Sequence, residues 1–357
     1  MLPVDRSATN AWAVQHVLAL VEIWALVAQH SGLVGAWRLT GVCRAALAGA
    51  KEWLGTLPGW VVYGGVDGYV HRLGEGWRLD LATLRWEPMP ALVPGRGYHS
   101  CCTVRGALVV LGEKYHNYET TSRVELLTGS GGDWGFASLP PLSCGRIFRA
   151  VAVPVEERDS AKGQVLLLGG SDEYGVSLST TVHLVDLATG VCTPQPALLD
   201  TRYDFMAARI PDGRVVVCAG GGTSHASAEV WGPLASGAAN TAWTWTQLPA
   251  MSVGRFGCCG CVMSDGRLAV LGGMTDSGLS SSCEALMVIE GGHWVSLPPM
   301  HRGRSSFACA AVGRCIIVAG GPGRSAEAYD ETLNRWTQLP CDVPGVGTLR
   351  GLGSALL

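Results

Sequence analysis

The sequence predicts a mainly β protein built from six similar units, each a four-stranded antiparallel sheet, preceded by a short helical segment. Three observations predict this. A pair of glycines recurs about every 50 residues, a tryptophan follows later in most units, and an arginine opens a strand of small residues in front of the glycine pair.

The last unit, residues 303–340, shows the order of elements most clearly. Phe307–Val312 is a strand-length run of small apolar residues, and Cys315–Ala319 is a β-branched run closed by Gly320-Gly321. Glu327–Asp330 alternates polar and apolar residues, and Trp336 marks a fourth strand. Four consecutive short strands predict a twisted antiparallel meander.

The other units repeat this order with few departures. The glycine pair falls at Gly64-Gly65, Gly112-Glu113, Gly169-Gly170, Gly220-Gly221, Gly272-Gly273 and Gly320-Gly321. The tryptophan position falls at Trp86, Trp134, Cys192, Trp245, Trp294 and Trp336. Because Glu113 and Cys192 break the pattern, we expect less regular packing in the second and third units.

These marks, from Gly59 to the C-terminus, resemble the kelch repeat, which is identified by its double glycine, a tyrosine or similar residue in the third strand, and its tryptophan. The resemblance implies a β-propeller with one blade per repeat. We therefore predict a six-bladed propeller over residues 58–357 and a separate helical segment over residues 1–57.

The two ends of the predicted propeller complement each other. The first unit starts directly at its second strand, Trp60–Tyr63, without a preceding first strand. Residues Arg350–Leu357 match the first strand of the other units. We expect this C-terminal strand to complete the first blade, which would remove two open sheet edges.

An arginine precedes the innermost strand of every unit: Arg96, Arg146, Arg202, Arg255, Arg304 and Arg350. Third-strand glutamates accompany it in four units: Glu125, Glu229, Glu284 and Glu327. We expect the arginine to pair with this glutamate inside the fold. The alternative is a ring at a channel mouth that binds a carboxylate or phosphorylated peptide. Arg146 and Arg350 lack the glutamate, so we predict that they bind a partner.

The connection between the second and third strands varies most between units, and such loops usually carry binding function. Those of the first three units are the longest and most aromatic, which suits a protein interface. The predicted partner-binding residues there are Tyr69, His71, Arg72, Tyr115, His116, Tyr118 and Tyr174.

The N-terminal segment shows apolar residues at helical spacing. We expect a helix from a cap at Asn10 to about Gln29, a break at Ser31-Gly32, and a second helix over Val34–Ala50.

Together the two predicted helices resemble the F-box motif, whose second helix carries Leu-x-x-Val-Cys-Arg, here Leu39, Val42, Cys43 and Arg44. The Leu-Pro start of the motif is displaced to Leu2-Pro3, and the expected tryptophan is absent. The resemblance implies that residues 14–50 bind a Skp-type adaptor of a cullin-RING ubiquitin ligase. A plain helical cap on the propeller is the alternative.

Composition narrows the remaining function classes. The 26 basic and 29 acidic residues nearly balance, so we expect neither nucleic acid nor a membrane as a partner. Thirteen cysteines without a visible secretory signal favour a reduced intracellular chain, cytoplasmic or nuclear.

The cysteines and histidines do not suggest a catalytic or metal site. Cys258-x-x-Cys261 is explained by an inner-strand position six residues after each arginine that is small in most units: Cys102, Ala152, Ala208, Cys261, Ala310 and Leu356. His99, like the other histidines, is expected to be exposed or satisfied. We predict a non-enzymatic protein-interaction module without cofactors, the ligase adaptor being its specific form. The alternatives are a generic scaffold and a kelch-fold enzyme such as a sugar mutarotase or copper oxidase.

Overall fold

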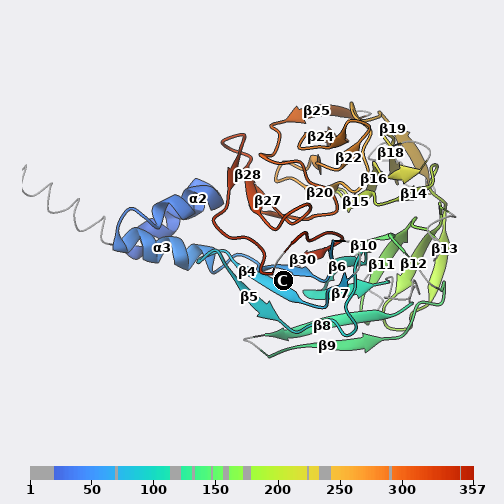
Figure 1. The fold of residues 1–357 in the computed structure, drawn as a ribbon, viewed down its shortest axis with the longest axis horizontal. Coiled ribbons are helices and arrows are strands. Elements are labelled where there is room, and N and C mark those ends of the chain that lie inside the picture. The colour runs from blue at the N-terminus through green and yellow to red at the C-terminus, as the bar shows by residue number, and fades with distance from the viewer. Residues whose placement is uncertain are drawn as a thin grey trace, which may run out of the picture.

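The computed structural model describes most of the chain: residues 20–68, 71–112, 122–130, 133–145, 148–155, 161–171, 178–222, 225–232, 243–288, 292–345 and 347–357. Six four-stranded sheets are arranged radially as a β-propeller, and the two helices of the described residues lie beside it (Figure 1). The predicted fold class is confirmed.

Each blade is a four-stranded antiparallel sheet whose strands follow one another from the channel outward. Blade 1 contains β30 (Gly353–Leu356), β1 (Trp60–Tyr63), β4 (Gly76–Asp80) and β5 (Arg85–Met89). Blade 2 contains β6 (Ser100–Val104), β7 (Ala107–Leu111), β8 (Val124–Ser130) and β9 (Asp133–Leu139). Blade 3 contains β10 (Val151–Val155), β11 (Gln164–Leu168), β12 (Val182–Asp186) and β13 (Cys192–Gln195).

The remaining blades follow the same order. Blade 4 contains β15 (Met206–Arg209), β16 (Val215–Cys218), β18 (Ala228–Trp231) and β19 (Trp245–Leu248). Blade 5 contains β20 (Cys259–Val262), β21 (Leu268–Leu271), β24 (Cys283–Met287) and β25 (His293–Leu297). Blade 6 contains β26 (Ala308–Val312), β27 (Cys315–Ala319), β28 (Ala326–Asp330) and β29 (Arg335–Gln338).

Short two-residue strands extend three blades on the face where the second and third strands are joined. They are β2 (Val66–Asp67) with β3 (His71–Arg72), β14 (Arg202–Tyr203) with β17 (Gly221–Gly222), and β22 (Met274–Thr275) with β23 (Gly278–Leu279).

The C-terminal strand closes the propeller as predicted. β30 pairs antiparallel with β1, with Ala355 opposite Val61. Gly59 and Leu357 exchange two backbone hydrogen bonds, of 2.7 and 2.8 Å, just beyond the paired strands. Blade 1 therefore takes its innermost strand from the end of the chain and its other three from residues 60–89.

The paired glycines allow the chain to turn close to the next blade. Gly64 and Gly65 have φ of 62° and 99°, and the Gly65 amide donates to the Arg96 carbonyl at 2.6 Å. A Cβ on Gly65 would lie 2.9 Å from the Arg350 carbonyl oxygen. Both the backbone conformation and the contact therefore favour glycine.

In blade 4 the predicted pair, Gly220-Gly221, is wrong by one residue. Ala219 and Gly220 hold the two left-handed positions, with φ of 65° and 103°. The Ala219 amide accordingly donates to the Ser227 carbonyl. In the other blades, the amide of the first glycine donates in the same way to a carbonyl of its own blade.

Apolar side chains fill the seams between neighbouring blades. Three of the repeat tryptophans fasten these seams on the outer side, because each donates its indole N–H to a proline carbonyl of the preceding blade. The pairs are Trp245 with Pro196, Trp294 with Pro249 and Trp336 with Pro298, at 2.8, 2.8 and 2.9 Å. The buried Trp86 indole N–H, by contrast, has no hydrogen-bond partner among the described residues. Cys192 of blade 3 uses its backbone amide instead, which donates to Ser143 Oγ at 2.8 Å.

In the described part of the N-terminal segment, two helices precede the propeller. The first, α2 (Val21–Leu39), is kinked at Gly32, which has φ 70° and ψ −177°, so the predicted break is confirmed. The second, α3 (Arg44–Leu54), begins after a turn at residues 40–43. The predicted single helix over Val34–Ala50 is therefore wrong, because Cys43 is extended and its Sγ caps the Ala46 amide.

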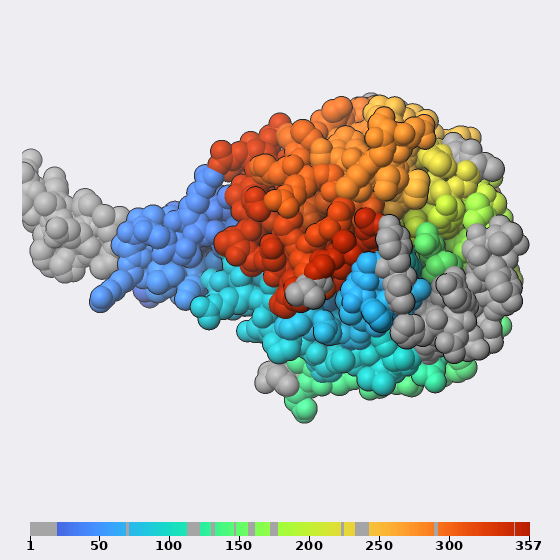
Figure 2. Space-filling model, in the orientation of Figure 1, coloured from blue at the N-terminus to red at the C-terminus, as the bar shows by residue number. Residues whose placement is uncertain are grey.

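The helices pack on the outer flank of blades 6 and 1, as Figures 1 and 2 show. Leu33 and Val34 are buried in one apolar cluster with Cys315 of β27 and Trp60 of β1. The Trp37 indole donates to the Leu81 carbonyl at 2.8 Å. Within the described residues, neither helix is long and apolar enough to cross a membrane.

Removal of Arg350–Leu357 should lower the melting temperature strongly and cause aggregation. The truncation leaves β1 as an unpaired inner edge and exposes Val61 and Tyr63, which are fully buried. Thermal unfolding and light scattering measure both effects. The full-length Arg350→Ala variant keeps the strand and is the control. Equal melting of the truncated and intact chains would contradict closure by β30.

Candidate functional site at the mouth of the central channel

Six left-handed residues form a ring where the innermost strands begin. They are Tyr98, Arg149, Asp204, Gly257, Ser306 and Gly351, one from each blade. Backbone hydrogen bonds join neighbours: Gly351 to Ser306 at 2.7 Å, Ser306 to Gly257 at 2.7 Å, and Gly257 to Asp204 at 2.8 Å, the first residue of each pair donating its amide. The ring borders a cavity of about 260 Å³ within the channel.

Arg149 is the central side chain of this mouth. Its guanidinium forms an ion pair with Asp204, and its Cζ lies 4.4 Å from the ring centre of Tyr98 and 5.5 Å from that of Tyr203. Burial raises the pKa of Asp204, and the Arg149 charge and hydrogen bond only partly oppose this rise. The mouth therefore combines a stacked cation with a carboxylate, and the two charges offset each other.

Three aromatic side chains extend this cluster across blades 3 to 5. Phe148, Tyr203 and Phe256 hold equivalent ladder positions and pair with Ser171, Gly221 and Met274, respectively. Those three partners begin the connections between second and third strands. The channel mouth and these connections consequently share one face of the propeller.

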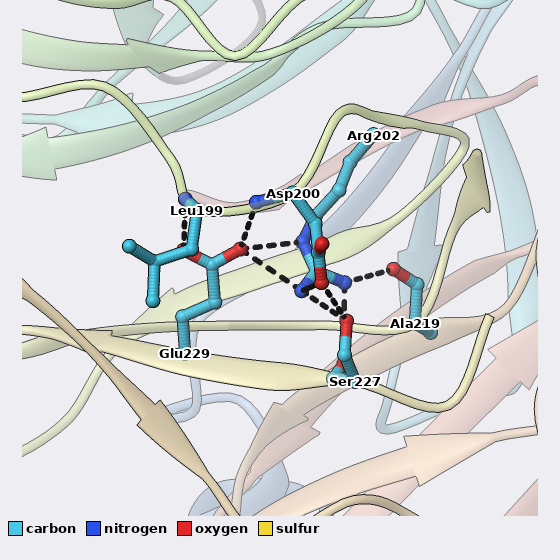
Figure 3. A network of polar contacts seen from close by, with 6 residues as sticks. All are labelled: Leu199, Asp200, Arg202, Ala219, Ser227 and Glu229. Atoms are coloured by element: carbon cyan, nitrogen blue, oxygen red, sulfur yellow. Dashed lines mark hydrogen bonds and ion pairs between the residues drawn. The ribbon is translucent and has the colours of Figure 1, made fainter. Parts of the chain in front are cut away.

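The repeat arginines lie behind this mouth, inside the blades. Figure 3 shows the network in blade 4. Arg202, 1% exposed, donates to Glu229 Oε1 from Nε at 3.0 Å and from Nη2 at 2.9 Å, and its Nη1 donates to the Ala219 carbonyl at 2.6 Å. Glu229 in turn accepts from the Leu199 and Asp200 amides. One ion pair thus fastens the glycine turn and the loop entering the blade.

The same pair recurs in blades 2, 5 and 6, as Arg96 with Glu125 at 2.6 Å, Arg255 with Glu284 at 2.6 Å and Arg304 with Glu327 at 2.8 Å. All four arginines are at most 2% exposed. The predicted structural pairing is confirmed in these four blades. The alternative of a peptide-binding arginine ring is wrong for them, because the guanidiniums are enclosed.

Glu327 illustrates the electrostatics of these pairs. Burial alone would raise its pKa. Hydrogen bonds from Arg304 and from the amide and ring of His301, with the Arg304 charge, outweigh burial and lower the pKa below its usual range. The carboxylate therefore stays ionised although its side chain is 1% exposed.

Arg350 differs from the four arginines of these pairs because it is one residue out of position. The Leu349 carbonyl accepts from the Gly321 amide at 2.8 Å, which is the contact that Arg96 makes with Gly65. Leu349 thus takes the buried arginine position in blade 1, and Trp77 faces Val62 where a glutamate stands elsewhere. Arg350 is half-buried, and its Nε has no hydrogen-bond partner among the described residues.

The predicted loop residues fall partly within the described chain. His71 and Arg72 form β3, and His71 Nδ1 lies 3.2 Å from Asp67 Oδ1. Tyr69, Tyr115, His116, Tyr118, Tyr174 and Arg146 lie outside the described residues. Their grouping into one binding patch therefore stays a prediction.

Sequence reasoning missed the residues that the structure gathers at the mouth: Tyr98, Arg149, Tyr203, Asp204 and Phe256. The sequence did contain a signal that could have identified most of them. All but Arg149 follow the repeat arginine of their unit by one or two residues. Arg149 follows Arg146 by three, so counting from the arginine does not align blade 3. A shift of one residue in the opposite direction affects blade 1, where Ala355 rather than Leu356 faces Val61 as Ala310 faces Ile317.

His99 contradicts the expectation of an exposed or satisfied histidine. It is 7% exposed, and neither ring nitrogen has a hydrogen-bond partner among the described residues. Burial, with the nearby Arg96 charge, lowers the pKa of His99 to about 3. The ring is therefore neutral at physiological pH, and it lines the cavity below the mouth.

Comparison with models of known protein families finds no match, and no curated protein is similar enough in sequence to count as a relative. In the described part of the chain, no group of three or more histidine, cysteine, aspartate or glutamate side chains could hold a metal ion.

Arg304→Met should destabilise the propeller by about 3 to 5 kcal/mol, because it leaves the buried Glu327 without its counter-charge. The double variant Arg304→Met with Glu327→Met should recover much of this loss, as blade 1 itself uses Leu349 and Trp77 at these positions. Urea-induced unfolding measures the free energy of unfolding of the single and the double variant. A single variant as stable as the parent would show that the pair is dispensable.

Proposed function

We propose that this chain is a kelch-type propeller that recognises a protein or peptide at the channel mouth and does no chemistry of its own. The observation that carries the proposal is the cluster of Arg149, Tyr98 and Tyr203, all half-buried on one mouth of the propeller. Tyrosine and arginine dominate binding energy at protein interfaces, because they bury wide surfaces while keeping a polar tip.

The charges of the mouth indicate what kind of segment fits. Asp204 offsets the Arg149 charge, and the surrounding rings offer apolar and aromatic area. A partner segment of mixed polarity with an aromatic or aliphatic anchor suits this mouth better than a polyanion. The predicted loop residues Tyr69, His71 and Arg72 would widen the interface on the same face.

We further propose an adaptor role for the helical segment, linking the bound protein to a cullin-RING ubiquitin ligase through a Skp-type subunit. The supporting observation is an apolar stripe at the start of α2, where Leu20, Ile23, Leu26 and Val27 are 48%, 37%, 56% and 37% exposed. Their spacing puts them on one side of α2. Val42 and Cys43 of the F-box-like motif are also exposed, in the turn before α3.

The rival function is a kelch-fold enzyme, a sugar mutarotase or a copper oxidase. Metal analysis of the purified protein and a sugar-turnover screen separate it from a binding module. Stoichiometric copper, or turnover of a sugar, would contradict the proposal of a binding module and favour an enzyme.

Tyr203→Ala should weaken partner binding by about 1 to 4 kcal/mol while changing the melting temperature little, because the ring is half-buried at the mouth. A partner captured by proximity labelling would be titrated against the purified variant. Arg209→Ala, at the opposite mouth of the channel, is the control and should bind normally. If Arg209→Ala loses the partner and Tyr203→Ala keeps it, the binding face is the opposite one.

Leu26→Asp in the full chain should abolish capture of a Skp-type subunit, since a charge on the stripe opposes its burial in an apolar groove. Leu333→Asp changes another exposed leucine, 46% exposed in the turn between β28 and β29, and should leave capture unchanged. Co-purification measures both. A parent chain that captures no such subunit would remove the adaptor role and leave a scaffold.

A further inference from the structure

The six seams around the channel pair residues in a regular way. Positions are counted from the left-handed residue at the start of each inner strand. The second residue after it in one blade contacts the third residue after the corresponding left-handed residue in the next blade. Ser100 Oγ accepts from the Ala152 amide at 2.7 Å, a Cβ on Gly260 would lie 2.7 Å from Met206 Cε, and one on Gly353 would lie 2.2 Å from Cys101 Sγ. In these seams a larger side chain faces a small one.

The seam between blades 5 and 6 breaks this rule by pairing two thiols. Cys259 opens β20 and Cys309 lies on β26, 50 residues later, and their Sγ atoms are 2.7 Å apart. Both line the cavity of the channel. None of the other five seams, all of which lie within the described residues, has cysteine on both sides.

We propose that Cys259 and Cys309 are a redox modification site, forming a reversible disulfide across this seam when a hydroperoxide enters the channel. The side chains already face each other on neighbouring inner strands. Closing from 2.7 Å to the bond length of about 2.05 Å needs only a small movement of the two Sγ atoms.

The reaction balances with a hydroperoxide as the oxidant. Cys259, the more exposed of the two, loses its proton and attacks one peroxide oxygen as a thiolate. The O–O bond breaks, Cys259 becomes a sulfenic acid, and the other oxygen leaves with that proton as water or an alcohol. The Cys309 sulfur then attacks the Cys259 sulfur, the disulfide forms, and the sulfenic oxygen leaves as water with the Cys309 proton. A small thiol reductant reverses the step.

Cys309 is suited to the second step. Hydrogen bonds to Cys259 and Cys261, together with burial, raise the pKa of Cys309. Cys309 therefore stays protonated and does not react with the peroxide before Cys259 does. Its S–H also reaches the Gly260 carbonyl at 3.3 Å. Cys261 is thus a competing partner, and the test must distinguish it.

The product can be identified directly by mass. Trypsin releases residues 256–267, which contain Cys258, Cys259 and Cys261, and residues 305–314, whose only cysteine is Cys309. After the full chain is treated with hydrogen peroxide and alkylated, we expect these two peptides to be joined with the loss of two hydrogens, and separated again by dithiothreitol. The oxidised chain should also melt a few degrees higher, because the cross-link restrains the unfolded chain.

Matched variants decide the assignment. Cys259→Ser and Cys309→Ala, which copy the Ser100 and Ala152 pair of the seam between blades 2 and 3, should fold normally and each abolish the linked peptide. Cys101→Ser changes a seam cysteine that faces glycine and should leave the link intact. A link that persists in Cys259→Ser, or peroxide treatment that yields only unlinked oxidised thiols, would overturn the proposal.

Discussion

Circular closure is the constraint on which the rest of this structure depends. Blade 1 obtains its innermost strand only if β30, near the C-terminal end of the sequence, pairs with β1. The innermost strands of neighbouring blades then lie side by side around the channel, and every seam between blades becomes buried. A defect at the join would expose a seam as well as an edge, so stability is shared among all six blades.

The buried arginine–glutamate pairs serve this closure by fastening the backbone where each blade meets the next. In blade 4 the guanidinium reaches the carbonyls of Ala219 and Ser227, and the carboxylate holds the amides of the incoming loop. An ion pair of this kind must offset a large desolvation cost. Blade 1 shows that an apolar Leu349 and Trp77 can occupy the same positions, so the pair orders the loops rather than being required by the fold.

The repeat supplies a scaffold on which individual positions can diverge. The left-handed residue at the start of each inner strand is a glycine in blades 1 and 5 but Arg149 and Asp204 in blades 3 and 4. A non-glycine residue there is held in a sparsely populated conformation, and backbone hydrogen bonds between neighbouring blades help to hold Tyr98, Asp204 and Ser306. Such positions concentrate charge and aromatic surface at one mouth without disturbing the strands behind it.

Much of the fold could be predicted from the sequence, because strand length, two-residue alternation and the glycine pairs are local properties of the chain. The closing strand and the pairing of Arg202 with Glu229 followed from comparing one unit with another. Only the tertiary structure decided what depends on register. A shift of one residue puts Leu349 where an arginine was expected and Ala219 where a glycine was expected. It also decided contacts between units, such as Arg149 with Asp204 and Cys259 with Cys309. These residues lie about 50 positions apart, and no local pattern states which two will meet across a seam.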